Sequence, residues 1–337
     1  MQAFQMQTEH ATWPFPVHFG DDTTSPIPII GDIVDAIYLR IVWPIQGVVN
    51  NSVATAMINF VELIHQSNVI ERIYGENMFI WNELTVAQGK RAGLQKLVGI
   101  DTTTSQSEYY LHLPFTIKLP LCALNIQPDL RIVFNTPDKF MAVPYKNEID
   151  LETVIDYVFL GDEERSYIQN NPQRYLTQSY QVLQFSIQPN QTNFKTVTSF
   201  VNNVKELFWI IQDQSPTDMY DYNDDLINMS LSFNGIEFLS NTVANNTYVS
   251  IIQPLEYHTR TPTSNVYLYS FALNPELQQP TGEINMTFIY NQNHAYWVRP
   301  STKLRYIRIY ALGYNVATID KGELSMMHTI NESGFKN

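Results

Sequence analysis

Hydrophobic and polar residues alternate over short stretches along most of the chain. The clearest stretch has large apolar side chains at every second position, namely Tyr267, Tyr269, Phe271 and Leu273. A period of two residues is typical of a half-buried β-strand. Pro275 has no N–H for a β-ladder, so this strand should end before it. A turn is predicted at residues 280–282, followed by a second strand with apolar positions at Ile284, Met286 and Phe288.

Similar runs predict further strands in the first half of the chain. They cover residues 33–43, 57–65 and 69–75, two segments within 109–135, and residues 151–161. Residues 76–86 instead place Phe79, Ile80 and Leu84 on one face of a helix. A short helix should follow Gly161, with Asp162 as its N-cap.

The second half repeats the pattern of the first. Four pairs of segments are similar in order: 37–43 and 204–212, 61–73 and 229–240, 109–120 and 266–275, and 154–162 and 304–314. Paired segments lie about 150–170 residues apart, which is the size of one domain. A regular set of weak internal similarities indicates a duplication. Asn234-Gly235 in the second half predicts a tight hairpin turn.

These patterns predict an all-β protein with two similar domains in tandem. Hydrophobic residues make up 44% of the chain and aromatic residues 13%, which is enough for a core in each domain. Seven or eight short strands in each half favour a sandwich or barrel over a parallel sheet. We assign residues 1–26 to an irregular N-terminal arm that orders only on assembly, with a short strand near 17–19. Residues 27–171 and 172–337 form the first and second domains.

Charge and composition exclude several classes of protein. The net charge is −13, from 20 Lys and Arg against 33 Asp and Glu, so a basic groove for nucleic acid is not expected. The single cysteine, Cys122, cannot form an internal disulfide and is predicted to be a buried small residue. The N-terminal residues lack the features of a secretory signal. No transmembrane segment is expected, because the most apolar early stretch contains Asp32, Asp35 and Arg40.

The sequence contains no recognisable catalytic motif. The segment around Gly89-Lys90 lacks the upstream glycine of a phosphate-binding loop, and the seven histidines lack metal-ligand spacing. His112 is expected to be a packed or edge residue. His258 is the most suggestive histidine, beside Glu256 and Arg260, but a structural hydrogen bond is the favoured interpretation. We therefore expect no enzyme, and no catalytic, cofactor-binding or metal-binding residues.

One acidic segment, residues 213–225, could bind calcium. Its candidate ligands are Asp218, Asp221, Asp224 and Asp225. The spacing is not that of an EF-hand, so a solvated surface loop is the favoured interpretation. Two adjacent acidic pairs, Glu163-Glu164 and Asp224-Asp225, are unsuited to acid–base catalysis because neighbouring side chains point apart. The aromatic strand at 267–271 could bind sugars or bases, but core packing is the favoured role.

Several longer stretches resemble one family. Residues 266–287 read VYLYSFALNPELQQPTGEINMT, and residues 49–85 contain VELIHQSNVIERIYGENMFIWNELT. Both are similar to the major capsid proteins of nucleocytoplasmic large DNA viruses, including iridoviruses and phycodnaviruses. The matching positions in the second stretch are Glu62, Arg72, Tyr74, Gly75, Glu76, Trp81, Asn82 and Glu83. Thr281 replaces the usual serine of the family. The resemblance extends from about Ile29 to Met327.

The resemblance implies that each domain is an eight-stranded antiparallel jelly roll, with a few short helices in loops. It implies a homotrimeric, pseudo-hexagonal capsomer that tiles an icosahedral virion shell around an inner membrane and a DNA genome. Neighbouring capsomers and minor or cement proteins would be its partners, without direct nucleic-acid contact. The protein would be in the virion, after assembly in the host cytoplasm. A minor capsid component with the same fold, an assembly scaffold and a secreted lectin are the alternatives.

Overall fold

A computed structural model of the chain describes residues 5–43, 52–99, 107–140, 148–216 and 218–329. The chain folds into two compact units. Unit 1 comprises residues 1–79, 89–178 and 315–330, and unit 2 comprises residues 80–88, 179–314 and 331–337.

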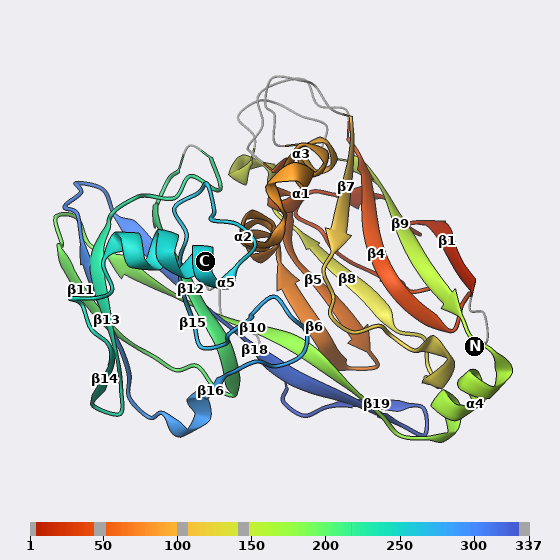
Figure 1. Ribbon diagram of the computed structural model, residues 1–337. Coiled ribbons are helices and arrows are strands. Elements are labelled where there is room, and N and C mark those ends of the chain that lie inside the picture. The colour runs from red at the N-terminus through yellow and green to blue at the C-terminus, as the bar shows by residue number, and fades with distance from the viewer. Residues whose placement is uncertain (1–4, 44–51, 100–106, 141–147, 217, 330–337) are drawn as a thin grey trace. The chain divides into compact units, whose positions relative to one another are not determined.

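Unit 1 contains two antiparallel sheets (Figure 1). The first has the order β1-β9-β4-β7, with strands β1 (Gln5–Thr12), β9 (Glu148–Phe159), β4 (Ile33–Val42) and β7 (Glu108–Leu113). A short strand, β2 (Val17–His18), also pairs with β9. The second has the order β3-β8-β5-β6, with strands β3 (Asp22–Pro26), β8 (Asp129–Phe134), β5 (Ile58–His65) and β6 (Asn68–Tyr74).

The second half of the chain forms a second pair of sheets. One has the order β10-β18-β12-β15, with strands β10 (Gln173–Ile187), β18 (Arg305–Asp320), β12 (Asn203–Asp213) and β15 (Tyr267–Ser270). Two short strands extend it: β16 (Ile284–Asn285) beside β12, and β19 (Glu323–Met326) beside β18. The other has the order β11-β17-β13-β14, with strands β11 (Asn193–Thr198), β17 (Gln292–Val298), β13 (Leu226–Phe233) and β14 (Ile236–Leu239).

The two sets of strands match one to one. When the eight main strands of each half are numbered along the chain, both halves have the sheet orders 1-8-3-6 and 2-7-4-5. The four pairs of similar segments predicted from sequence fall on equivalent strands: β4 and β12, β5–β6 and β13–β14, β7 and β15, and β9 and β18. The predicted fold class, two antiparallel jelly rolls in tandem, is confirmed.

The helices are short and lie in the connections. They are α1 (Val53–Ala56), α2 (Gly75–Thr85), η1 (Gln88–Lys90), α3 (Arg91–Val98), η2 (Leu121–Ala123), η3 (Pro137–Lys139), α4 (Asp162–Asn170), η4 (Tyr248–Ile252), α5 (Gln253–Tyr257) and η5 (Met286–Phe288). The predicted helix near residues 76–86 is confirmed as α2. The predicted cap of α4 is wrong: Gly161 occupies the N-cap position, and Asp162 is the first helical residue.

The short strand expected near residues 17–19 is confirmed as β2, but the prediction that the rest of the N-terminal arm is irregular is wrong for the described residues. Residues 5–26 contain three strands, and β1 pairs with β9 along its full length, from Gln5 opposite Phe159 to Thr12 opposite Glu152. Its side chains are mostly exposed and polar. Backbone hydrogen bonds, rather than buried side chains, hold this outer strand, so hydrophobic alternation could not identify it.

The strand predicted at 284–288 is much shorter than expected. Only Ile284 and Asn285 pair with β12, and the chain then forms the helical turn η5, where the Asn285 side chain accepts a hydrogen bond from Thr287 N. The strand before it, β15, ends at Ser270, because the next two backbone N–H groups both donate to the carbonyl of Lys205. Leu273 is therefore exposed rather than half-buried.

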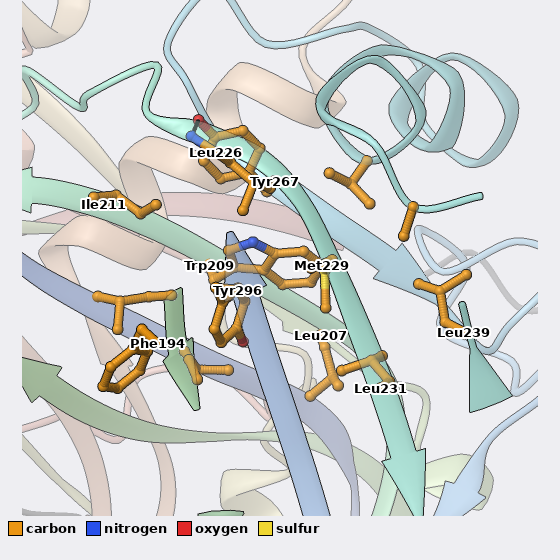
Figure 2. Close-up of a cluster of buried hydrophobic side chains, with 14 of the residues drawn as sticks. Phe194, Leu207, Trp209, Ile211, Leu226, Met229, Leu231, Leu239, Tyr267 and Tyr296 are labelled. Atoms are coloured by element: carbon orange, nitrogen blue, oxygen red, sulfur yellow. Dashed lines mark hydrogen bonds between the residues drawn. The ribbon is translucent and has the colours of Figure 1, made fainter. Parts of the chain in front are cut away.

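Aromatic side chains form much of each core. In unit 2, Trp209 lies between Tyr267 and Tyr296, with ring centroids 6.4 and 6.2 Å away (Figure 2). In unit 1, Phe19 makes edge contacts with Trp43 and Phe140. Tyr267 is fully buried, which confirms the core role favoured for that strand.

Candidate functional site

A buried cluster of charged side chains in unit 2 is centred on His258, the residue that follows α5. The imidazole Nε2 lies 2.7 Å from Oε1 of Glu206, and Nδ1 lies 3.1 Å from Oε1 of Glu276. A histidine that donates to two carboxylates must carry protons on both nitrogens. The predicted structural hydrogen bond is confirmed, but its partners are Glu206 and Glu276 rather than the neighbouring Glu256 and Arg260.

Lys205 joins the same cluster because β12 is irregular at this point. The register between β12 and β18 shifts between Val204 and Glu206, which leaves Lys205 as an extra residue. Such a bulge turns two consecutive side chains toward the same region. The Lys205 ammonium donates to the carbonyl of Pro275 at 2.6 Å. It also lies over the rings of Trp81 and Tyr314, at 5.6 and 5.3 Å.

The charges of this cluster balance, with two cations and two carboxylates. Burial alone would lower the pKa of His258, but Glu206 and Glu276 raise it to about 9. Burial lowers the pKa of Lys205 to about 8 despite the same two carboxylates. Burial would raise the pKa of Glu276, yet hydrogen bonds from His258 and Thr259 keep it below its usual value. Mutual neutralisation makes the burial of Lys205, Glu206 and His258 tolerable, with the partly exposed Glu276 as the second carboxylate.

The cluster fixes the loop that follows β15. Besides its contact with His258, Glu276 accepts hydrogen bonds from the backbone N and the hydroxyl of Thr259, both at 2.7 Å. Further along the loop, Gly282 has φ +149, and a Cβ there would lie 2.7 Å from the carbonyl of Phe271. The Asn-Pro-Glu and Pro-Thr-Gly parts of the sequence signature therefore hold the loop in place.

A second signature segment, residues 81–84, contributes to the same unit. Trp81 meets the His258 ring edge to face, with 6.0 Å between centroids. Glu83 pairs with Arg260 at 2.9 Å and accepts two hydrogen bonds from Thr263. Burial would raise the pKa of Glu83, but the contacts with Thr263 and Arg260 lower it. Segments about 180 residues apart are thus joined by buried polar contacts.

In unit 1, the matching signature residues also form a structural network. Glu62 is fully buried and pairs with Arg72 at 2.5 Å and with Arg131 at 2.9 Å. Both guanidinium groups lie over the Phe60 ring. Gly75 is required for close packing, because a Cβ there would lie 2.2 Å from the carbonyl of Ile58. These residues connect β5, β6 and β8 side by side.

The acidic segment at 213–225 is engaged in internal contacts. Asp225 pairs with the buried Arg305 at 2.6 Å, and Asp213 pairs with Lys303 at 2.6 Å. Asp224 contacts Arg299 and the Asn246 amide, and Asp218 accepts a hydrogen bond from Tyr220 N. Within the described ranges, which omit residue 217, no three His, Cys, Asp or Glu side chains are placed to hold a metal ion. The calcium interpretation gains no support from this geometry.

The other candidate residues do not form a site. His112 is exposed on β7 and contacts Tyr38, as expected of an edge residue. Cys122 is only half-buried, so the prediction of a buried residue is wrong. Glu163 and Glu164 are exposed in the first turn of α4. Among the helices of the described segments, none is long and apolar enough to cross a membrane.

Sequence reasoning missed Lys205, Glu206 and Glu71. Lys205 and Glu206 stand directly before the apolar run Leu207–Ile211 of β12, and adjacent charges beside such a run were a usable signal. Glu71 is buried in β6 and accepts hydrogen bonds from Thr116 N at 2.7 Å, from the Thr116 hydroxyl, and from Gln178 N at 3.0 Å. Burial raises its pKa to about 7 despite these donors.

Two family models match successive parts of the chain. The model described as the major capsid protein N-terminus matches residues 1–161, and the model of the large eukaryotic DNA virus major capsid protein matches residues 164–329. The major capsid protein of Pyramimonas orientalis virus is 25% identical over 95% of this chain and 89% of its own length. That of Phaeocystis pouchetii virus is 23% identical over 95% of this chain and 92% of its own length.

Solved structures agree on the fold. A chain of the PBCV-1 virus capsid matches with a TM-score of 0.85 at 18% identity, over 98% of both chains. The Faustovirus major capsid protein matches with a TM-score of 0.77 at 9% identity, over 95% of this chain and 91% of its own. The strand order and these matches define a double jelly-roll capsid protein. The chain belongs to the family of major capsid proteins of large eukaryotic DNA viruses, and its role is structural rather than enzymatic.

Proposed function

We propose that three copies of this chain form a pseudo-hexagonal capsomer that tiles an icosahedral shell. The observation that carries this proposal is the repeated strand order of the two halves. Each chain contributes two similar jelly rolls, so three chains together place six similar modules around a three-fold axis. Such a block can meet six neighbours through related contacts, although the exact symmetry of the trimer is only three-fold.

The buried networks support a mechanical role. Ion pairs such as His258–Glu206 and Arg72–Glu62 connect separate strands and loops. In this proposal, residues 27–171 and 172–337 supply successive jelly rolls, with β1 to β3 completing the first. The particle would be assembled in the host cytoplasm, around an inner membrane and with cementing minor proteins.

The mass of the purified protein in solution tests the capsomer. A species at three times 39.0 kDa that survives dilution, with a hexagonal outline in electron micrographs, is the expected result. A stable monomer across the concentration range would contradict an obligate trimer. It would favour the minor capsid component, which low copy number in purified particles would identify.

A further inference from the structure

One end of the unit 2 jelly roll carries several exposed large apolar side chains. Three connections meet there: residues 199–202, the hairpin turn at Asn234-Gly235, and residues 271–291. Asn202 O accepts a hydrogen bond from Met286 N, and the Asn234 side chain bonds the backbone of Phe288 and Tyr290. The segment 286–290 is therefore held between the other two connections.

Large apolar side chains project from this end into solvent. Tyr290 is 84% exposed, Ile236 73% and Phe288 68%. Phe238 is 46% exposed, and its ring contacts Phe233, Tyr269 and Phe271. We call Ile236, Phe238, Phe288 and Tyr290 the hairpin patch. Exposed aromatic residues over a packed aromatic base are typical of protein-binding surfaces.

The hairpin patch adjoins the edge of a sheet. In the order β11-β17-β13-β14, strand β14 is last, and β13 is its only neighbour among the strands of the described residues (Figure 1). An edge strand with exposed Ile236 and Phe238, and with neither proline nor lysine, can accept another extended chain.

In unit 1, an extended strand approaches the edge equivalent to that of β14. Strand β6 occupies the same position in its sheet as β14 does, and β19, whose own ladder is with β18, passes near it without pairing. Both belong to unit 1. Among the described strands, only β13 pairs with β14. The backbone groups on the outer edge of β14 are therefore open to pairing with an added strand.

The charges at this end of unit 2 indicate which kind of segment would bind there. The three connections and β14 contain Glu237, Glu276 and Glu283 but no lysine or arginine. Glu276 is paired with His258, whereas Glu237 and Glu283 are exposed, with no cationic partner in the part of the chain that the structure describes. A basic segment is complementary to this end, while an anionic lipid surface is not.

We propose that the edge of β14 and the hairpin patch bind an extended segment of a partner protein, with alternating apolar side chains flanked by lysine or arginine. The segment adds as a strand to β14, and its apolar side chains cover Tyr290 and Ile236. Only the identity of the partner, a second component of the same shell, rests on the proposed function.

The test uses the full-length protein and a fluorescent peptide of alternating valine and threonine between lysine pairs. We expect saturable binding, with amide hydrogen exchange slowed at Ile236–Leu239. Tyr290→Ser and Ile236→Lys should each weaken binding by about tenfold, as for residues central to an interface. Tyr167→Ser, which removes a similarly exposed tyrosine from α4, should change the Kd less than twofold. A peptide with glutamates in place of the lysines should bind about tenfold more weakly.

Other outcomes would overturn the proposal. Equal binding to the Tyr290→Ser protein, or protection confined to another strand, would place the peptide elsewhere. If Ile236→Lys changes the mass of the assembly and the wild type does not bind the peptide, the hairpin patch is a contact between copies of this chain. Flotation with neutral phosphatidylcholine vesicles without peptide binding would indicate a lipid surface. Because mass is measured separately, failure of the trimer and failure of this site are distinguishable.

Discussion

His258 and Glu206 form a fully buried ion pair, with 2.7 Å between the imidazole Nε2 and a carboxylate oxygen. The pair connects the end of α5 to the centre of a sheet, and Glu276 extends it to the signature loop. The pair should therefore affect both the stability of the protein and the way in which that stability depends on pH.

We predict that His258→Gln destabilises the protein by about 3 kcal/mol at pH 6.5, because it leaves buried carboxylates without a cation. The pKa of His258 is about 9 in the folded protein against about 6.5 unfolded. Its contribution is therefore complete below pH 6.5 and is lost as pH rises toward 9.

Urea denaturation at several pH values tests this. Between pH 6.5 and 8, the difference in unfolding free energy between wild type and His258→Gln should shrink by about 2 kcal/mol. His10→Gln, which changes an exposed histidine on β1, should show the wild-type slope. A constant difference across this range would mean that His258 is neutral in the folded protein.

We predict that Glu71 makes the unfolding free energy depend on pH in a lower range. Burial raises its pKa to about 7, above its usual value near 4.5. The protonated form is therefore favoured by folding, and the associated stability is lost as pH rises from 4.5 through 7. Relative to Glu71→Gln, the wild-type unfolding free energy should fall by about 3 kcal/mol over this range. Glu163→Gln on the exposed surface of α4 is the control, and parallel curves for wild type and Glu71→Gln would contradict the prediction.

The acidic segment at 213–225 should behave as a structural element. Arg305 is fully buried and depends on Asp225 for its charge partner, so Asp225→Asn should cost about 3 kcal/mol. Millimolar calcium should leave the thermal midpoint unchanged, because the neighbouring aspartates already bind protein donors and cations. A calcium-dependent rise of several degrees, abolished by Asp225→Asn, would instead establish an ion site.

We predict that position 282 does not tolerate alanine in place of Gly282. Its φ of +149 and the 2.7 Å approach of the Phe271 carbonyl should make Gly282→Ala destabilising by about 1–3 kcal/mol. Gly89→Ala is the matched control, since a Cβ there meets no atom within 4 Å. Similar midpoints for the two variants in urea would show that the loop can relax.

Sequence patterns predicted the strands that bury one face and the duplication that relates them. They succeeded at β4, β5, β12 and β13 because alternation reports burial directly. They failed at β1, where an outer strand with polar side chains is held by its backbone. They also failed after Ser270, where two N–H groups converge on one carbonyl and end the alternation.

The candidate site was only partly predictable. His258 could be identified as a structural residue from its setting, but its partners lie 52 and 18 residues away. No spacing rule connects Glu206 with Glu276. The bulge at Lys205 brings the side chains of Lys205 and Glu206 into the same region. It depends on the register between β12 and β18, which the residues around Lys205 in the sequence do not reveal.

The pairing of β1 with β9 has a consequence for how the chain folds. Gln5 lies opposite Phe159 and Thr12 opposite Glu152, so the ladder of β1 cannot be completed until residues 152–159 have been synthesised. Contacts between such distant residues are entropically costly to close and slow the folding of β-proteins. Until then the edge of β1 is open to wrong partners, which makes the first jelly roll the step at which a chaperone would be most useful.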